Sequence, residues 1–170
     1  MIAADEDCHV VTISSGAGIT VNPGFASYSM TKHAVVALTE ALYLDLATQG
    51  IANIGVTIVM PGVVQSRIMF PERTGLDILQ AELKSRHNNP VMAALEAGMR
   101  GAVDAGLPVA ELADQVFDAV ARGDLYVLPN FTDPTSQTIA QDIAMGRATA
   151  TNPYPPMIAA MLAPATEDPA

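Results

Sequence analysis

Three short apolar runs in the chain have the composition of buried β-strands. Residues 9–14 and 55–60 are rich in β-branched side chains, and each run ends in a turn, Ser-Ser-Gly in the first case and Pro-Gly in the second. Residues 125–128 form a third, shorter run. Apolar runs of this kind, bounded by Gly, Pro and Ser, are typical of strands in a parallel sheet that is covered on both faces. We therefore expect parallel strands at these three places.

Between the first two runs, apolar residues recur at helical spacing. Residues 27–49 carry one stripe that recurs every three or four positions and a second stripe beside it, formed by Val35, Leu38, Leu42 and Leu46 and by Val36, Tyr43 and Ala47. Gly50 is a natural end for this helix. Two stripes predict two apolar faces, of which one packs on the sheet and the other is open to a partner.

Four further helices are expected, at residues 76–86, 91–104, 109–122 and 137–147. The alternation of strands and helices predicts an α/β layer architecture with right-handed crossovers. Residues 1–150 would form this domain, with a lid region at 63–105, and the Pro- and Ala-rich residues 151–170 predict a poorly ordered tail. Three strands make a thin parallel sheet. Either further strands lie outside this sequence, or association protects an open edge.

Composition and charge exclude several classes of function. The chain has 170 residues, of which half are hydrophobic and 15% are charged, and this composition predicts a folded domain. Its net charge of −10 argues against nucleic-acid and anionic-membrane partners, because both need a basic surface. No signal peptide or membrane span is recognisable, so we expect a cytoplasmic protein. The single cysteine, Cys8, and the three histidines lack the spacing of a zinc site, so no metal is expected.

Two residues at the start of the long helix can perform acid–base chemistry. Tyr28 and Lys32 are four positions apart and therefore project from one face of a helix. An ammonium group beside a phenol favours the phenolate, which makes the tyrosine a candidate proton donor and acceptor. A serine at the end of the preceding strand could stabilise charge on the same substrate oxygen. Taken alone, the pair is as well explained by a half-exposed tyrosine beside a solvated lysine.

The combination of motifs is more specific, and it resembles the short-chain dehydrogenase/reductase family. Three stretches carry the resemblance: Val11-Thr-Ile-Ser-Ser-Gly-Ala-Gly18, Tyr28-Ser-Met-Thr-Lys32 and Val59-Met-Pro-Gly-Val-Val-Gln-Ser66. They fall within residues 9–70, and the similarity is looser over 76–150. The resemblance implies a Rossmann-like three-layer fold of parallel strands and flanking helices.

The resemblance also implies a role for each matching residue. Ser15 falls at the substrate-orienting serine, Tyr28 at the proton donor and acceptor, and Lys32 at the residue that holds the nicotinamide ribose. The loop beside the nicotinamide ring corresponds to Pro61, Gly62, Val64 and Ser66, although Ser66 stands where a threonine is more usual. The implied reaction is hydride transfer between NAD or NADP and a small alcohol or ketone, with the tyrosine as acid/base.

Departures from the family pattern lead to a second interpretation. The family's opening strand and its glycine-rich turn are not found, and Gly16-Ala-Gly18 follows the serine strand instead. We therefore expect only the C-terminal catalytic part of the family's domain, with the N-terminal strands missing. The alternative to an enzyme is then a truncated, inactive fragment or an association module without the dinucleotide-binding half. In both cases we expect that this chain alone is inactive and that it forms a homo-oligomer through helix 27–49.

Overall fold

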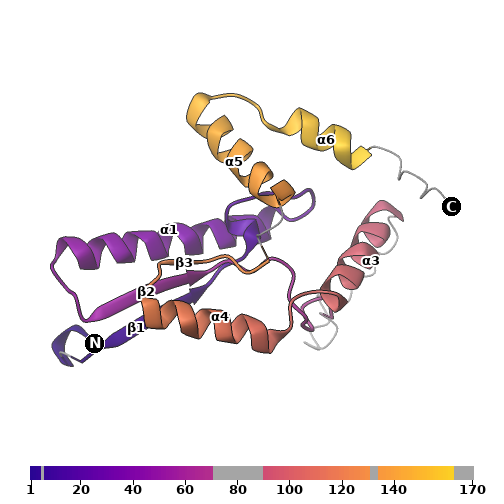
Figure 1. Ribbon diagram of the computed structural model, residues 1–170. Helices are drawn as coiled ribbons and strands as arrows, with labels where there is room; N and C mark the ends of the chain where they lie inside the picture. The colour runs from indigo at the N-terminus through magenta and orange to yellow at the C-terminus, as the bar shows by residue number, and fades with distance from the viewer. Residues whose placement is uncertain (5, 71–89, 131–133, 163–170) are drawn as a thin grey trace.

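The computed structural model describes residues 1–4, 6–70, 90–130 and 134–162. Its centre is a parallel three-stranded sheet in the order β1 (Cys8–Ile13), β2 (Ile54–Val59) and β3 (Tyr126–Val127). Helix α1 (Ala26–Thr48) covers one face and α4 (Val109–Arg122) the other, so the described part of the chain forms three layers (Figure 1). The expected α/β fold with a parallel sheet and flanking helices is confirmed.

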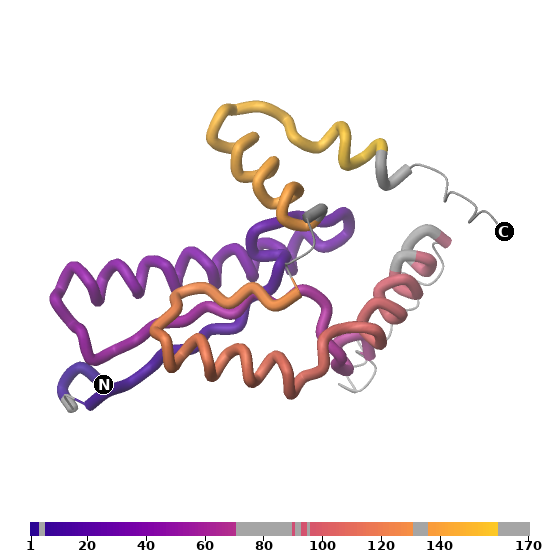
Figure 2. The backbone as a smooth tube through the Cα atoms, viewed as in Figure 1, coloured from indigo at the N-terminus to yellow at the C-terminus, as the bar shows by residue number. Residues whose placement is uncertain are grey.

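The other elements lie toward the two ends of the sheet. Short 3-10 turns occur at η1 (Ile2–Ala4) and η2 (Gly16–Gly18). Helix α3 (Pro90–Asp104) lies beyond the carboxyl ends of the strands. Helices α5 (Pro134–Thr149) and α6 (Tyr154–Leu162) form a hairpin over the amino-terminal end of α1, as the backbone trace shows (Figure 2).

Strand β2 is the centre of the hydrophobic core. Ile58 and Val59 are fully buried on opposite faces of the sheet, Ile58 against Val36 of α1 and Val59 against Ala119 of α4. Burial on both faces explains why this strand is apolar throughout instead of alternating.

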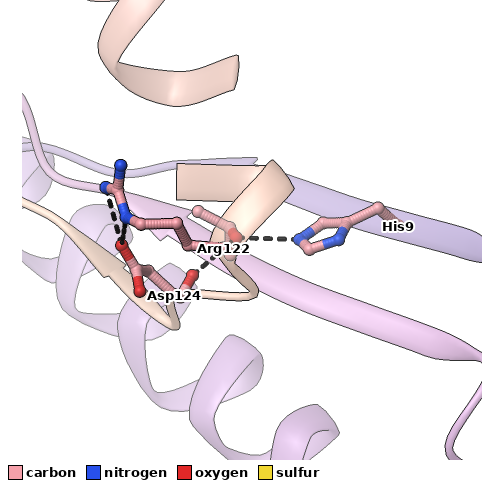
Figure 3. Close-up of polar contacts among 4 residues, drawn as sticks. His9, Arg122 and Asp124 are labelled. Atoms are coloured by element: carbon pink, nitrogen blue, oxygen red, sulfur yellow. Dashed lines mark hydrogen bonds and ion pairs between the residues drawn. The ribbon is translucent and has the colours of Figure 1, made fainter. Parts of the chain in front are cut away.

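A chain of polar contacts joins β1 and β2 to the loop before β3 (Figure 3). The Thr57 hydroxyl of β2 donates to the Asp124 carbonyl at 2.7 Å and lies 2.8 Å from His9 Nε2 of β1. A hydroxyl has one proton, which the carbonyl takes, so His9 must donate from Nε2. The carboxylate of Asp124 in turn forms an ion pair with Arg122 at 2.8 Å. The polar network therefore fixes the histidine tautomer and links β1 to the loop before β3.

Most predicted elements occur where the pattern placed them. The three strands and the helices expected at 27–49, 91–104, 109–122 and 137–147 are confirmed, with ends that differ by at most three residues. The helix expected at 76–86 lies outside the described residues. The expectation of a poorly ordered tail from residue 151 is wrong at α6. Its prolines stand in the first turn, where a missing N–H costs nothing, and Asn152 Oδ1 accepts a hydrogen bond from Tyr154 N at 3.0 Å.

The outer edge of β1 carries no strand partner among the residues that the structure describes. Val11 and Ile13 on this strand are 39% and 55% exposed, whereas β2 is buried almost throughout. We expected N-terminal strands to be missing. The structure does not confirm this expectation, which stays a prediction. None of the described helices is long and apolar enough to cross a membrane.

Candidate active site

Hydrogen bonds bring the ends of β1 and β2 together at one edge of the sheet. The Ser14 N–H donates to the Val59 carbonyl and the Gly16 N–H to the Pro61 carbonyl, both at 2.8 Å. Ser15 therefore lies beside the Pro61-Gly62 turn. Carboxyl ends of parallel strands are where α/β proteins bind ligands, so the structure places two of the predicted motifs in one candidate site.

Helix α1 begins close against the same edge. The buried Ser14 hydroxyl donates to the Lys32 carbonyl of α1 at 2.8 Å. Gly18 lies in this contact, because a Cβ added there would stand 2.6 Å from Ser14 Oγ, 2.8 Å from a Val36 methyl and 3.0 Å from the Lys32 carbonyl. A residue without a side chain is thus what allows the turn after β1 to pack on the first turns of α1.

Lys32 lies between the tyrosine and the serine strand. Its Nζ is 5.7 Å from the centroid of the Tyr28 ring and donates a hydrogen bond to the Ile13 carbonyl at 3.1 Å. An ammonium within about 6 Å of a ring centroid is attracted to the ring face. The predicted neighbourhood of Tyr28 and Lys32 on one helix face is therefore found, and Lys32 also reaches the strand that leads into Ser15.

Ser15 caps the short turn that follows β1. Its half-buried Oγ accepts a hydrogen bond from the Ala17 N–H at 3.2 Å. Because the hydroxyl acts there as acceptor, its own proton can be donated to another group. Gly16-Ala-Gly18 forms the turn η2 and α1 begins later, at Ala26, so these glycines do not open a helix directly after the strand.

The loop after β2 is held by the connection between α3 and α4. Val64 forms a parallel bridge with Leu107, and the exposed Ser66 hydroxyl accepts from Ile68 N at 3.4 Å. A cavity of about 520 Å³ opens beside this loop. Its lining residues come from the loop, the end of α3, the connection to α4 and the chain after β3: Gly62, Val63, Ala102, Ala105, Gly106, Leu107, Asn130 and Ser136.

Two contacts of the site region were not predicted from the sequence. Asn130 donates from Nδ2 to the Val63 carbonyl at 2.7 Å, and Arg147 of α5 lies 3.3 Å from His33 Nε2 on α1. His33 Nδ1 lies 2.9 Å from the Ser29 carbonyl, next to Tyr28. The one local signal was Asn130 itself, because asparagine adopts the left-handed conformation more readily than most residues. The contact from α5 had no signal, since the sequence predicted only a helix at 137–147 and not its position in the fold.

A comparison with protein families matches residues 1–76 to the short chain dehydrogenase model. Residues 1–76 are therefore similar to the short-chain dehydrogenase family. This segment contains all the residues predicted for the site. The expectation that the chain is the C-terminal part only is not confirmed, because the family match falls on the N-terminal side of this chain.

Relatives and solved structures agree with the dehydrogenase assignment. A short chain dehydrogenase/reductase from Burkholderia phymatum, solved in complex with NAD, matches 90% of this chain with a TM-score of 0.74 and 29% identity. The CLA biosynthesis dehydrogenase/reductase of Lactiplantibacillus plantarum is 27% identical over 84% of the chain. An NADPH-dependent 3-dehydrocapnine reductase of Ornithobacterium rhinotracheale is 29% identical over 65%.

The chain spans about half or less of these proteins. It covers 52% of the Burkholderia structure, 48% of the Lactiplantibacillus dehydrogenase and 36% of the Ornithobacterium reductase. The comparisons therefore support an oxidoreductase of the short-chain dehydrogenase type in general.

Proposed function

We propose that this chain carries the catalytic centre of an NAD(P)-dependent oxidoreductase that acts on a small alcohol or ketone. The observation that carries the proposal is the position of Lys32, which contacts both the Tyr28 ring and the Ile13 carbonyl. The phenol and the cation thus lie on α1 near the carboxyl end of β1, the strand that leads into Ser15. The dehydrogenases and reductases among the relatives support this assignment.

The residues of the site fit a nicotinamide cofactor, either NAD or NADP. Ribose hydroxyls need hydrogen-bond donors, and the Lys32 ammonium has three, of which the Ile13 carbonyl takes one. Pro61, Gly62, Val64 and Ser66 lie on the loop at the end of β2, where the backbone of Val64 and the hydroxyl of Ser66 would meet the ring carboxamide. When bound, the nicotinamide supplies hydride transfer, which no side chain can perform.

The side chains would handle the proton and the charge. Tyr28 would exchange the proton of its Oη with the substrate oxygen, as general acid in reduction and general base in oxidation. The Ser15 hydroxyl proton would be donated to the same oxygen, which stabilises negative charge that develops there. The Lys32 ammonium lies over the Tyr28 ring, 5.7 Å from its centroid, and so brings a positive charge beside the proposed proton-transfer residue.

A pair of tyrosine substitutions tests the catalytic role. Tyr28→Phe removes the hydroxyl at the site, whereas Tyr43→Phe removes one from an exposed position farther along α1. We expect Tyr28→Phe to lower NAD(P)H-dependent turnover of carbonyl substrates about 100-fold or more, since acid–base catalysis contributes at least that much. The Tyr43→Phe variant should keep the turnover of the unsubstituted protein. Equal turnover in the two variants would refute the role of Tyr28.

One observation favours a second candidate, an association module without its own dinucleotide site. Among the described residues, no helix opens directly on a glycine-rich turn after a strand, which is where the family seats a pyrophosphate. Fluorescence titration with NADH and NADPH separates the candidates. Micromolar affinity of this chain would exclude the second candidate, and the absence of any binding would exclude catalysis by this chain alone.

We also propose that α1 joins copies of the chain into a homo-oligomer in the cytoplasm. Its outer side exposes three large apolar side chains, Met30, Leu38 and Leu44, with Met30 and Leu38 each 69% exposed. Contiguous exposed apolar surface on a helix indicates an association site. Sedimentation should find an oligomer that Leu38→Glu dissociates, and a monomeric starting protein would refute the proposal.

A further inference from the structure

Asn130, three residues after the end of β3, contacts the loop that follows β2. Its backbone has a φ of 63°, which is the left-handed region, and its Nδ2 donates to the Val63 carbonyl at 2.7 Å. The residue before it takes part as well, because the Pro129 carbonyl accepts from the Gly62 N–H at 3.2 Å. Two neighbouring residues after β3 therefore hold two neighbouring residues of the loop.

The Val63 carbonyl receives a second donor from the opposite side of the cavity. The Leu107 N–H donates to it at 3.0 Å, and the Leu107 carbonyl accepts from the Gln65 N–H at 2.9 Å. This is the pattern of a parallel bridge in which the N–H and C=O of Val64 itself point away from Leu107.

The geometry of the peptide bond extends this constraint to Val64. In a trans peptide the carbonyl of one residue and the N–H of the next point in opposite directions. Two donors that fix the Val63 carbonyl therefore also fix the direction of the Val64 N–H. No cis peptide occurs among the residues that the structure describes, which include Val63 and Val64, so this relation holds here.

We propose that Asn130 is a positioning residue for the cofactor loop. By holding the Val63 carbonyl it fixes the direction of the Val64 N–H, which points away from Leu107. The Asn130 side chain itself touches neither the reacting atoms nor Tyr28. The proposal rests on the proposed dehydrogenase function for the identity of the ligand, but not for the contact between Asn130 and the loop.

Two substitutions separate the amide from the backbone conformation. Asn130→Asp keeps the shape of the side chain and tolerates the left-handed conformation, but it replaces the donor by a carboxylate that repels the Val63 carbonyl. Asn130→Gly also tolerates the conformation and removes the side chain. Asn152→Asp is the matched control, because it introduces the same charge while its Oδ1 can still accept from Tyr154 N.

The first measurement is amide hydrogen exchange in the segment 62–66, which needs no ligand. We expect both Asn130 variants to exchange about five- to tenfold faster in this segment, as the loss of one hydrogen bond implies. Exchange in β2 and α1 should stay unchanged, as it should everywhere in Asn152→Asp. Unchanged exchange at 62–66, or a uniform increase over the whole chain, would overturn the proposal.

The second measurement is the affinity for NADH and NADPH by fluorescence titration. We expect the dissociation constant of both Asn130 variants to rise by a similar factor, about five- to tenfold. Faster local exchange with unchanged affinity would overturn the link to the cofactor. If the unsubstituted protein does not bind either dinucleotide, the proposed function fails, and the exchange measurement still decides whether Asn130 holds the loop.

Discussion

The packing of Gly18 against α1 gives a prediction whose sign is decisive. Gly18 is buried, and its φ lies outside the left-handed region, so alanine there meets no backbone obstacle. In open surroundings Gly→Ala at such a position stabilises a protein by about 0.4–1 kcal/mol, because it restricts the unfolded chain. Because Gly18 lies in close contact with α1, Gly18→Ala must instead destabilise the protein.

The size of the effect follows from the three atoms that a Cβ would meet. Carbon atoms in contact are normally about 3.5–4.0 Å apart, whereas the Val36 methyl would be at 2.8 Å. Rotation of Ser14 away from its 2.6 Å contact would sacrifice the hydrogen bond to the Lys32 carbonyl, which contributes about 1 kcal/mol. The Lys32 carbonyl is backbone, so α1 itself must move. Overpacking of this kind costs about 1–3 kcal/mol, which leaves a net destabilisation of about 1–3 kcal/mol.

Urea unfolding followed by circular dichroism measures this difference. With a slope of about 1–3 kcal/mol per molar urea, Gly18→Ala should lower the midpoint by about 1 M. Gly101→Ala on α3 is the control, because no atom lies within 4 Å of a Cβ there and alanine favours a helix. Its midpoint should rise. A Gly18→Ala midpoint at or above that of the unsubstituted protein, together with a raised Gly101→Ala midpoint, would refute the packing argument.

Two further predictions concern the sheet and its contact with α1. Thr57→Val removes the hydroxyl that joins His9 to the Asp124 carbonyl, so the free energy of unfolding should fall by about 1–3 kcal/mol. Thr57→Ser keeps the hydroxyl and should recover part of this loss. An unchanged urea midpoint in Thr57→Val would contradict the prediction. Partial burial and then the hydrogen bond to Glu40 raise the pKa of Tyr126 in the folded chain. The unfolded chain therefore loses this proton first, and the stability that Tyr126 contributes should decline as pH rises above about 10. Tyr126→Phe should lose this part of the pH dependence, and equal alkaline profiles would contradict the assignment.

The sequence allowed most of the fold to be predicted because the strands and helices are locally encoded. The apolar run of β2 is continuous since the strand is buried on both faces, and turn residues bound it. Helix α6 was missed for a local reason as well. A Pro-rich composition argues against a helix, so Pro155 and Pro156 led to the expectation of an irregular tail. In the structure they stand in the first turn of α6, after the Asn152 cap, where proline is compatible with a helix.

In the candidate site, too, local features could be predicted from the sequence and long-range contacts could not. Tyr28 and Lys32 could be placed together from the sequence, because helical geometry alone fixes a spacing of four residues. Asn130 could not, since it meets Val63 across 67 residues of chain and only the parallel order of β2 and β3 brings the two together. A motif within one helix turn can therefore be predicted from the sequence alone, whereas a distant residue that orients the loop after β2 cannot.

For Gly18 the sequence predicted membership of a motif but not the packing contact that the residue makes. The run that ends in Gly18 was recognised as part of a family pattern, but the pattern did not say that its last glycine faces α1. The structure supplies the reason: the Lys32 carbonyl and Val36 occupy the space of the missing side chain. The same close approach lets Lys32 Nζ reach the Ile13 carbonyl beside the serine strand. If Gly18→Ala moves α1 outward, the lysine must lose reach toward that carbonyl. Stability and turnover should therefore fall together in this variant, whereas Tyr28→Phe should lower turnover and leave the urea midpoint in place.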